Sequence, residues 1–381
     1  MDLHNRYPSV ADLRKRAKRR IPKFVWEYLD SGTGTESTKA LNRTALDRIG
    51  MMPSVLDGEF TPDLSTRFLG RDYPVPFGVA PIGMSGLMWP DAEGHLARAA
   101  ARAKIPYAIS TVATQSPEDV APHLGEAAWF QMYPPRVPEV RRDMLNRARD
   151  AGFTGLILTV DVPVASRRER QVRSGLTNPP RLTPRLMGQV ALRPAWAWQT
   201  AKRGMPHMRG LDKYTTAATA NLPPTAHMGY ILRTAPGWEY VDWLREEWDG
   251  DFMVKGVMRP EDASRLDGMG VDAIWVSNHA GRQFDGAPAA IDALPAIRAA
   301  TDKPLIFDSG IEGGLDILRA IALGADFVML GRAFHFALGA LGPKGIDHLI
   351  DILAKDMASN MGQIGARDLR SLPETIRLDR L

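Results

Sequence analysis

The sequence predicts an α/β fold, an eight-stranded parallel TIM (β/α)8 barrel, and three observations carry the prediction. Eight short apolar runs recur along the chain, most of them followed by turn or polar residues and then by a helical pattern. The runs are continuous rather than alternating in apolar residues, as in strands buried on both faces of a parallel sheet. Eight successive strand-then-helix units in one chain are typical of a TIM barrel.

The predicted elements follow one another in a regular order. Strands are expected at residues 77–80, 107–110, 129–132, 156–160, 252–255, 273–276, 305–308 and 327–330. Helices are expected at 93–104, 138–151, 260–269, 288–300 and 314–323, several with Pro near the start and Gly near the end. A Rossmann sheet is the competing arrangement, but no Gly-x-Gly-x-x-Gly motif follows the first strand.

Two regions lie outside this repeat. An N-terminal extension precedes residue 74 and contains a helical stretch near 22–29. An excursion of about 162–250 follows the fourth strand, and a connection of that length is usually functional. We therefore expect a single domain over residues 1–381, with the barrel at about 74–340.

Basic residues gather in both of these regions. Residues 173–213 combine many Arg and Lys with Trp196, Trp198 and several Met. That composition suits a segment lying on a membrane surface, and it equally suits a lid whose aromatic side chains pack on the barrel. The run 14–20, rich in Lys and Arg, is expected to be the solvated face of a helix.

Composition excludes several classes of function. The absence of cysteine excludes disulfides, thiolate nucleophiles and iron–sulfur clusters, and it fits a reducing compartment such as the cytoplasm. The eight histidines show no metal-ligand spacing, so no metal site is expected. The start lacks a signal peptide's apolar stretch, and no run of about 18 apolar residues could span a bilayer. A net charge of +4 without a recognised binding module gives no reason to expect nucleic acid as a partner.

The most informative motif is the stretch 277–283, which follows the predicted strand 273–276. It sets His279 and Arg282 three residues apart. Imidazole is the usual general base near neutral pH, and a guanidinium can clamp a carboxylate with two hydrogen bonds. The pair therefore suits a site that takes a proton from a small substrate while holding its carboxylate.

Other polar or backbone groups follow almost every predicted strand, and in a TIM barrel the carboxyl ends of the strands form one rim. They are Ala80, Pro81, Gly83, Ser110, Gln131, Tyr133, Thr159, Asp161, Lys255, Ser277, Asp308, Gly310, Gly331 and Arg332. The last two strand ends, with Gly310, Gly331 and Arg332, suit the phosphate site of such barrels. A cation such as Lys255 on the opposite wall would stabilise the anionic reduced form of a flavin.

These residues resemble those of the FMN-dependent L-2-hydroxy acid oxidising enzymes, the family of glycolate oxidase and of lactate and mandelate dehydrogenases. The resemblance runs from about residue 22 to about 365. It rests on Tyr28 with Ser31-Gly32, Ala80-Pro81, residues 130–133, 159–163, 167–169, 254–256, 277–279 and 281–283, Asp308-Ser309-Gly310 and Leu330-Gly331-Arg332. The Trp-bearing segment resembles the membrane-associating excursion of the bacterial respiratory L-lactate and mandelate dehydrogenases.

The resemblance implies a role for each matching residue. His279 would take the proton, and Asp161 would stabilise the resulting imidazolium. Substrate would be held by Tyr28 and Arg282 at its carboxylate, by Tyr133 at its hydroxyl and by Arg168 nearby. FMN would be held by Ala80, Pro81, Gly83, Ser110, Gln131, Thr159, Lys255 and Ser277 around its ring system, by Asp308 at its ribityl chain, and by Gly310, Gly331 and Arg332 at its phosphate.

The chain departs from the family pattern at four positions. Glu312 stands where many relatives have an Arg that helps to hold the FMN phosphate, so we expect weaker FMN retention. Ala280 replaces a Gly after the histidine, and Ile82 replaces a common Thr. Val112 stands where glycolate oxidase has a Trp, which should widen the substrate pocket.

The resemblance leaves three functions to compare. The leading one is oxidation of an L-2-hydroxy acid, with L-lactate favoured, and transfer of the electrons to a quinone or other acceptor by a homotetramer lying in the cytoplasm or on the inner face of the cell membrane. The second is an oxygen-using oxidase of mandelate-like or longer acids that makes hydrogen peroxide. The third, from a different class, is a phosphate-binding barrel without redox chemistry.

Overall fold

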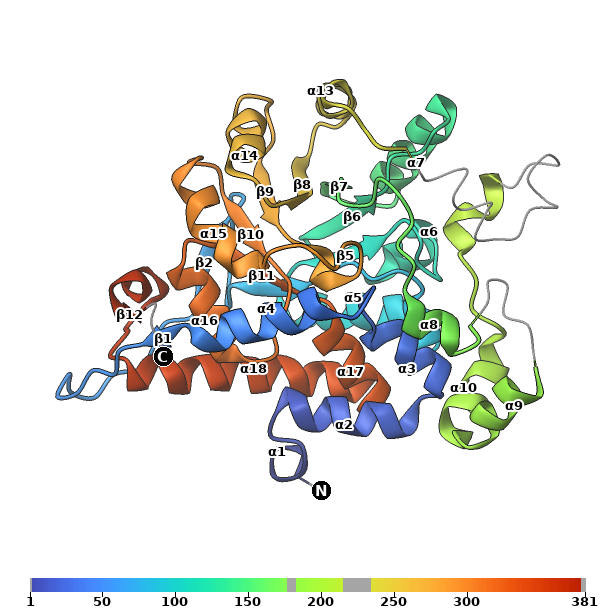
Figure 1. The fold of residues 1–381 in the computed structure, drawn as a ribbon, viewed down its shortest axis with the longest axis horizontal. Coiled ribbons are helices and arrows are strands. Elements are labelled where there is room, and N and C mark those ends of the chain that lie inside the picture. The colour runs from blue at the N-terminus through green and yellow to red at the C-terminus, as the bar shows by residue number, and fades with distance from the viewer. Residues whose placement is uncertain (1, 177–182, 215–233, 378–381) are drawn as a thin grey trace.

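The computed structural model describes residues 2–176, 183–214 and 234–377, and its centre is a closed parallel barrel (Figure 1). The barrel strands are β4 (Phe77–Val79), β5 (Tyr107–Ser110), β6 (Ala128–Met132), β7 (Gly155–Thr159), β8 (Asp251–Val257), β9 (Ala273–Val276), β10 (Leu305–Phe307) and β11 (Phe327–Leu330). They follow each other around the barrel in sequence order, and β11 pairs with β4 to close it. The predicted TIM barrel is therefore confirmed, with strand ends displaced by at most two residues.

Helices surround the barrel and link successive strands. They are α5 (Ala92–Ala103), α7 (Pro138–Asp150), α13 (Trp238–Glu247), α14 (Pro260–Asp267), α15 (Ala290–Ala299), α16 (Gly314–Ala322) and α17 (Arg332–Leu341). Shorter turns are η1 (Ser85–Leu87), α6 (Pro117–Val120), η2 (Ala121–His123), η4 (His279–Gly281) and η5 (Leu369–Thr375). Pro occupies the first turn of α7 and α14, where its missing N–H costs nothing. The five predicted barrel helices all form.

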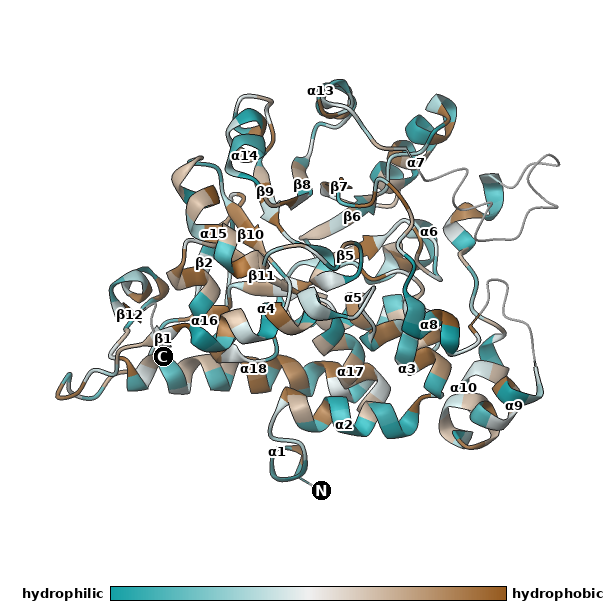
Figure 2. Cartoon of the chain, viewed as in Figure 1, coloured by the Kyte–Doolittle hydropathy of each residue, from teal (hydrophilic) through white to brown (hydrophobic). Residues whose placement is uncertain are grey.

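A long helix that was not among those predictions, α18 (Pro343–Gln363), crosses beneath the barrel helices. It alternates between apolar and polar residues along its length (Figure 2). Its buried side chains include Ile346, Leu349 and Leu353. This spacing of three and four residues places them on one face, which packs against α17 and α16.

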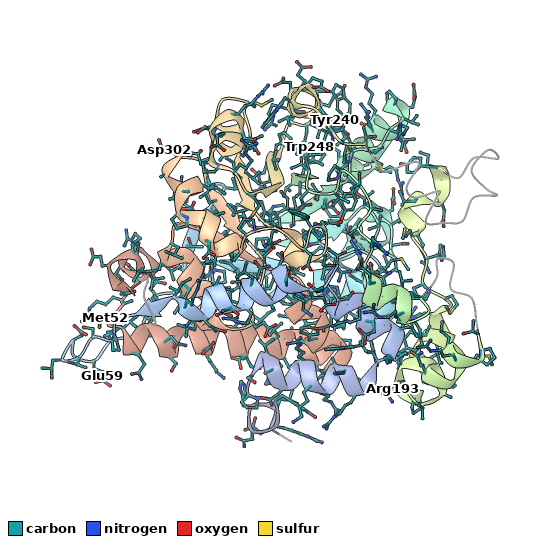
Figure 3. The ribbon with its side chains drawn as sticks, viewed as in Figure 1. Met52, Glu59, Arg193, Tyr240, Trp248 and Asp302 are labelled. Atoms are coloured by element: carbon teal, nitrogen blue, oxygen red, sulfur yellow. The ribbon has the colours of Figure 1, made fainter. Side chains whose placement is uncertain are left out.

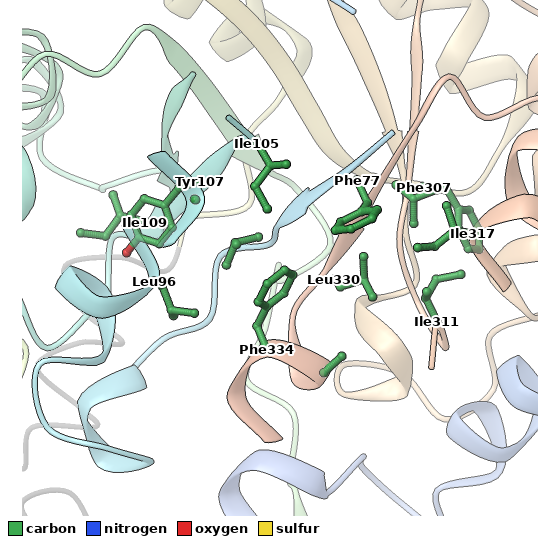
Figure 4. Packing of buried hydrophobic residues seen from close by; sticks show 14 of the residues in the cluster. Phe77, Leu96, Ile105, Tyr107, Ile109, Phe307, Ile311, Ile317, Leu330 and Phe334 are labelled. Atoms are coloured by element: carbon green, nitrogen blue, oxygen red, sulfur yellow. The ribbon is translucent and has the colours of Figure 1, made fainter. Parts of the chain in front are cut away.

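Side chains alternate between the inside and the outside of the barrel, and they form two separate cores. Outward-facing residues such as Phe77, Phe307 and Leu330 pack under the surrounding helices (Figure 4). Inward-facing residues such as Trp129, Trp275 and Phe327 fill the interior. The hairpin of β2 (Thr66–Phe68) and β3 (Arg71–Tyr73) closes the end of the barrel where the strands begin, since Phe68 and Tyr73 contact the Phe327 ring with centroids 5.0 Å and 5.3 Å away.

The N-terminal extension forms α1 (Leu3–Arg6), α2 (Val10–Arg20), α3 (Lys23–Asp30) and α4 (Ser37–Arg48). The predicted stretch near 22–29 is α3. A short strand β1 (Gly50–Met51) then pairs with β12 (Ile376–Arg377), which joins the extension to the far end of the described chain.

The prediction that run 14–20 is a solvated helix face is only partly right. Lys15, Lys18 and Arg19 are exposed, but the other basic side chains of α2 bind its neighbours. Arg16 Nε donates to the Ala340 carbonyl, and Arg20 lies over the Trp89 ring. The charged heads reach these partners because they flank Leu13 and Ala17, which are buried where α2 packs against α17.

The excursion between β7 and β8 contains α8 (Glu169–Arg173), α9 (Pro184–Ala191), α10 (Pro194–Arg203) and η3 (Arg209–Tyr214), at the right of Figure 1. Arg193, labelled in Figure 3, anchors it to the end of α2 through the Ile21 carbonyl, 3.2 Å away. The two tryptophans behave differently. Trp196 is buried and donates to the Leu87 carbonyl, whereas Trp198 is 63% exposed. No described helix is long and apolar enough to cross a membrane.

Candidate active site

A cavity of about 900 Å³ opens at the carboxyl ends of the barrel strands. It is lined by most of the residues that the sequence singled out: Tyr28, Ala80, Pro81, Gly83, Gln131, Tyr133, Thr159, Arg168, Lys255, His279, Arg282, Asp308, Gly310, Gly331 and Arg332. Three predicted residues, Ser110, Asp161 and Ser277, lie behind this lining and contact it. Strand ends far apart in sequence thus meet at one site.

His279 lies on the cavity wall in a strained turn. His279 and Ala280 have left-handed backbone angles, with φ of 53° and 55°, and Gly281 follows with φ of 71°. The left-handed region costs a residue with a side chain about 1–2 kcal/mol, and such strain is concentrated at functional sites. The His279 amide donates to Ser277 Oγ, and the Ala280 amide donates to Ser309 Oγ, which together hold the turn.

Asp161 lies behind this imidazole, with its Oδ1 2.9 Å from Nδ1 of His279. It can come this close because residue 256 is Gly, where an added Cβ would lie 2.6 Å from the Asp161 Cβ. Burial raises the pKa of Asp161, but the imidazole and Lys255 outweigh burial and hold the pKa below its usual value. The ionised carboxylate accepts the Nδ1 proton, which leaves Nε2 as the free basic nitrogen of the ring.

Arg282 lies beside Tyr28 in the same cavity. Its guanidinium donates to the carbonyls of Ser31 and Leu29 and lies over the Tyr28 ring. No carboxylate of the described chain pairs with it. Burial, together with the charge of Arg168, lowers the pKa of Arg282 to about 9. Because a guanidinium stays protonated in proteins, Arg282 is a buried cation without a paired carboxylate.

Arg168 and Tyr133 line the same cavity as Arg282 and Tyr28. Arg168 Nε donates to Ser166 Oγ, and its side chain has no acidic partner within the described ranges. Burial and then the charge of Asp161 raise the pKa of Tyr133, so its hydroxyl stays protonated and can donate a hydrogen bond. Tyr28 Oη donates to the Gly83 carbonyl 3.0 Å away, which fixes the ring against the rim.

Lys255 is a buried cation at the end of β8. Its Nζ lies 2.9 Å from Asp308 Oδ2 and 2.6 Å from Ser277 Oγ. Ser277 is fully buried, so it positions Lys255 and the His279 turn rather than facing the cavity. These contacts therefore fix the orientation of both groups, the Lys255 ammonium as a positive charge and the Asp308 carboxylate as a hydrogen-bond acceptor.

The far end of the cavity is cationic and backbone-rich. Gly331 precedes α17, and the side chain of Arg332 at its first position forms no hydrogen bond or ion pair with other described residues. Burial lowers the pKa of Arg332, and the charges of Asp30 and Glu312 oppose this shift. Glu312 also lines this end, and it forms an ion pair with Arg14, 3.6 Å away. The contact with Arg14 pairs the Glu312 carboxylate with a cation, but the carboxylate still lines the cavity.

The remaining wall shows which part of the site local patterns missed. Ile82 and Val112 line the cavity, as expected from their positions after the first two strands. Val172, Leu176 and Met208 also line it, and they come from the excursion. Their only signal in the sequence was the apolar content of a segment too long for a simple connection.

The fit to FMN can be judged from unpaired polar atoms. Gln131 Nε2 and Thr159 Oγ1 are buried without a hydrogen-bond partner, although both residues line the cavity. Ser110 Oγ donates to Gln131 Oε1, which orients the free amide nitrogen. Buried polar groups are normally paired, so a ligand with polar ring edges would complete them. Among the residues described, no group of three or more His, Asp or Glu could hold a metal ion.

A barrel with a His–Asp pair, unpaired guanidinium groups and a buried Lys around one large cavity defines a flavin-type oxidoreductase site. The model of the FMN-dependent dehydrogenase family matches residues 17–378, and the chain belongs to this family. Its cofactor is FMN, which does not fit the alternative of a barrel without redox chemistry.

Individual relatives agree over nearly the whole length. The chain is 38% identical to an L-lactate dehydrogenase of Caulobacter vibrioides over 98% of each chain. It is similar to the crystal structure of the monotopic membrane protein (S)-mandelate dehydrogenase, with a TM-score of 0.92, 34% identity and coverage of 97% and 99% of the two chains. It is also similar to mandelate oxidase, with a TM-score of 0.82, 32% identity and coverage of 97% and 98%.

Proposed function

We propose that this enzyme oxidises an L-2-hydroxy acid to the 2-oxo acid, with L-lactate as the favoured substrate. The observation that carries the proposal is a single cavity lined by Arg168, Arg282 and Arg332, which form no ion pair with described residues, and by His279, which is paired with Asp161. One end suits a substrate carboxylate and the other suits a phosphate. The full-length relatives named L-lactate dehydrogenase support the choice of substrate.

In this proposal the substrate lies between His279 and the cavity cations. Arg282 and Tyr28 bind its carboxylate, while Tyr133 and Arg168 contact its hydroxyl side. His279 Nε2 accepts a proton from the substrate, and the Asp161 carboxylate stabilises the imidazolium that results. Val112, Ile82 and Met208 surround the substrate side chain and exclude water from it.

FMN, when bound, supplies a two-electron acceptor beside the substrate. Lys255 is proposed to stabilise negative charge on its ring, and Ser277 and Asp308 keep the ammonium in place. The ring would be held by the side chains of Gln131 and Thr159, by Ser110 acting through Gln131, and by the backbone of Ala80, Pro81 and Gly83. Asp308 would accept from the ribityl chain, and Gly310, Gly331 and Arg332 would hold the phosphate.

We further propose that the enzyme is one domain that assembles as a homotetramer and passes electrons to a quinone from the inner face of the cell membrane. Exposed apolar side chains of the excursion, including Met187, Leu192 and Trp198, would touch the membrane. The similarity to a structure described as a monotopic membrane protein supports this placement. The burial of Trp196 supports the alternative that part of the excursion is a lid whose aromatic side chains pack on the barrel. In this proposal the excursion both covers the barrel and touches the membrane.

Anaerobic bleaching of the flavin by a panel of L-2-hydroxy acids tests the proposal. L-lactate should bleach it faster than glycolate or L-mandelate, and a quinone should restore the oxidised spectrum faster than oxygen does. A flavin that no 2-hydroxy acid bleaches would refute the proposed reaction.

The second candidate is an oxygen-using oxidase of larger acids. The apolar wall of Ile82, Val112 and Met208 and the similarity to mandelate oxidase favour it. Peroxide formation at a rate near that seen with an artificial electron acceptor would establish this function instead. Faster bleaching of the flavin by L-mandelate than by L-lactate would likewise favour larger acids as the substrates.

A further inference from the structure

A second cavity lies outside the barrel, between α5 and the excursion. Its volume is about 510 Å³, and it shares no lining residue with the active-site cavity. Residues of α5, of the turns after β5 and of α10 and the start of η3 surround it. Neither the proposed reaction nor FMN binding uses this space.

The cavity is strongly cationic. Four guanidinium or ammonium groups line it, those of Arg98, Lys202, Arg203 and Arg209, together with the imidazoles of His95 and His123. Asp91 is the single acid in its lining, and it is paired with Arg203 at 2.9 Å. Arg209 is paired with Asp119 at 3.6 Å, so two of the four cations, Arg98 and Lys202, remain without an acidic partner among the described residues.

Several of these groups converge on one point of the floor. A Cβ added at Gly94 would lie 3.2 Å from the His123 ring, 3.3 Å from Gln115 Oε1 and 3.5 Å from Arg98 Nη1. Gly94 therefore leaves open the space toward which a side-chain cation and an imidazole both point. A larger residue would fill that space.

Two of the four cations, Arg98 and Lys202, are not neutralised by an acid of the described chain. Arg98 donates to Nδ1 of His95 at 2.8 Å and has no carboxylate partner in the described part of the chain. Lys202 lies over the Trp198 ring and likewise has no acidic partner there. Burial lowers the pKa of His95, and Arg98, Arg203 and His123 lower it further, whereas Asp91 opposes them. Positive groups held together without a counter-ion make an anion a favourable occupant.

We propose that this cavity binds a multiply charged anion of phosphate chemistry. Donors approach from α5, from the η2 turn and from the excursion, which suits the several acceptor oxygens of a phosphate better than the planar pair of a carboxylate. Lys202 joins the cavity to the exposed Trp198, so a phospholipid headgroup could reach it from a membrane surface as readily as a phosphate ester from solution.

The test compares two double variants of the FMN-loaded, full-length enzyme. Arg98→Gln with Lys202→Gln removes two cations from the cavity. The control is Arg102→Gln with Arg185→Gln. Arg102 lies on α5, the helix that carries Arg98, and Arg185 lies in the excursion, and neither residue lines the cavity. Equilibrium dialysis with labelled pyrophosphate and sedimentation with vesicles of phosphatidylglycerol and phosphatidylcholine are measured for each, alongside turnover.

We expect the cavity variant to lose about tenfold in anion binding while the control and the turnover of both remain unchanged. A loss confined to pyrophosphate identifies a soluble phosphate ligand, and a selective loss on phosphatidylglycerol vesicles identifies a lipid headgroup. Equal behaviour of the two double variants in both assays would overturn the proposal. If Arg98→Gln does not fold, Lys202→Gln with Arg209→Gln replaces it, because both of these side chains are exposed.

Discussion

Two groups of charged residues lie close together in this enzyme and differ in how their charges are balanced. Around Asp30, the cations of Arg14, Lys39 and Arg170 are 2.7 Å, 3.2 Å and 2.6 Å from its carboxylate. In the neighbouring cavity, Arg282 and Arg332 form no ion pair with a described residue, although the charge of Asp30 still acts on Arg332. The difference teaches that a buried charge with its partners stabilises the fold, whereas a buried charge without them is held ready for a ligand.

The largest effect is expected for His279 on the cavity wall, because its replacement should change the turnover rate but not the folding of the enzyme. His279→Gln should lower kcat on the order of 10²–10⁴-fold, because general base catalysis contributes that much. Flavin absorbance should show that FMN still binds. His207→Gln, an exposed histidine with its own Asp212 partner, is the control. Near-normal turnover of His279→Gln would mean that another group takes the proton.

A matched pair of arginine variants addresses the two regions directly. Arg282→Met should lower kcat/KM by about 10²-fold, because it removes a cation that faces the substrate, with little change in unfolding free energy. Arg170→Met should do the reverse and cost about 2 kcal/mol of stability, because it leaves Asp30, Glu27 and Glu36 short of a partner. Steady-state kinetics and urea unfolding of both variants measure the two effects. Equal losses of unfolding free energy in the two variants would show that the two regions do not differ in this way.

The Asp30 cluster should also make stability depend on acid pH. Burial raises the pKa of Asp30, but Lys39, Arg14 and Arg170 outweigh it and hold the pKa at about 2, below the ordinary 3.8. A depressed carboxyl pKa adds stability above the unfolded value, so about 2 kcal/mol should be lost as the pH falls from about 4 to about 2. Urea unfolding of the native enzyme and of Asp30→Asn across this range should show a loss that is about 2 kcal/mol smaller in the variant, because other carboxylates titrate in both.

A smaller effect is expected at the phosphate end, where a carboxylate lines the cavity. Glu312→Arg should tighten FMN binding by about tenfold, because it replaces an acid near the phosphate with a cation. Quenching of flavin fluorescence on binding gives the affinity. Glu374→Arg, on an exposed turn, makes the same change in net charge elsewhere. Unchanged or weaker binding by Glu312→Arg would show that Glu312 does not disfavour the phosphate.

The smallest effect concerns the strained turn of the catalytic wall. Ala280 has a φ of 55°, which Gly adopts without a steric penalty. Ala280→Gly should therefore raise the free energy of unfolding by up to about 1 kcal/mol, with the gain reduced by the greater freedom of Gly in the unfolded chain. Thermal unfolding with FMN bound measures it, and a clear loss of stability would contradict the strain.

Much of the fold could be read from local patterns, and the rest could not for identifiable reasons. Continuous apolar runs placed all eight barrel strands, because a strand buried on both faces has no polar positions. By contrast, α17 and α18 follow the last strand, where no further strand marks their ends. The basic residues of α2 were read as solvated because their partners, such as Ala340, lie more than 300 positions away.

The residues of the site likewise divide into those that local patterns predicted and those that they did not. Strand-end positions predicted that Gln131, Thr159, Lys255 and His279 would share one cavity, because parallel strands bring their carboxyl ends to one rim. The sequence could not indicate that Ser110 and Ser277 would act from behind the lining. Nor could it indicate that Met208 would reach the substrate end from the excursion.

The sequence by itself therefore determined the barrel and the rim of polar strand ends that includes His279 and Arg282. These features depend on residue order and on a strand geometry that repeats locally. Tertiary structure alone decided which charges are paired. Arg170 pairs with Asp30 across 140 positions, while Arg282 and Arg332 form no ion pair in the part of the chain that is described. Coulomb interactions depend on distance in space, so only the folded chain separates structural cations from those that await a ligand.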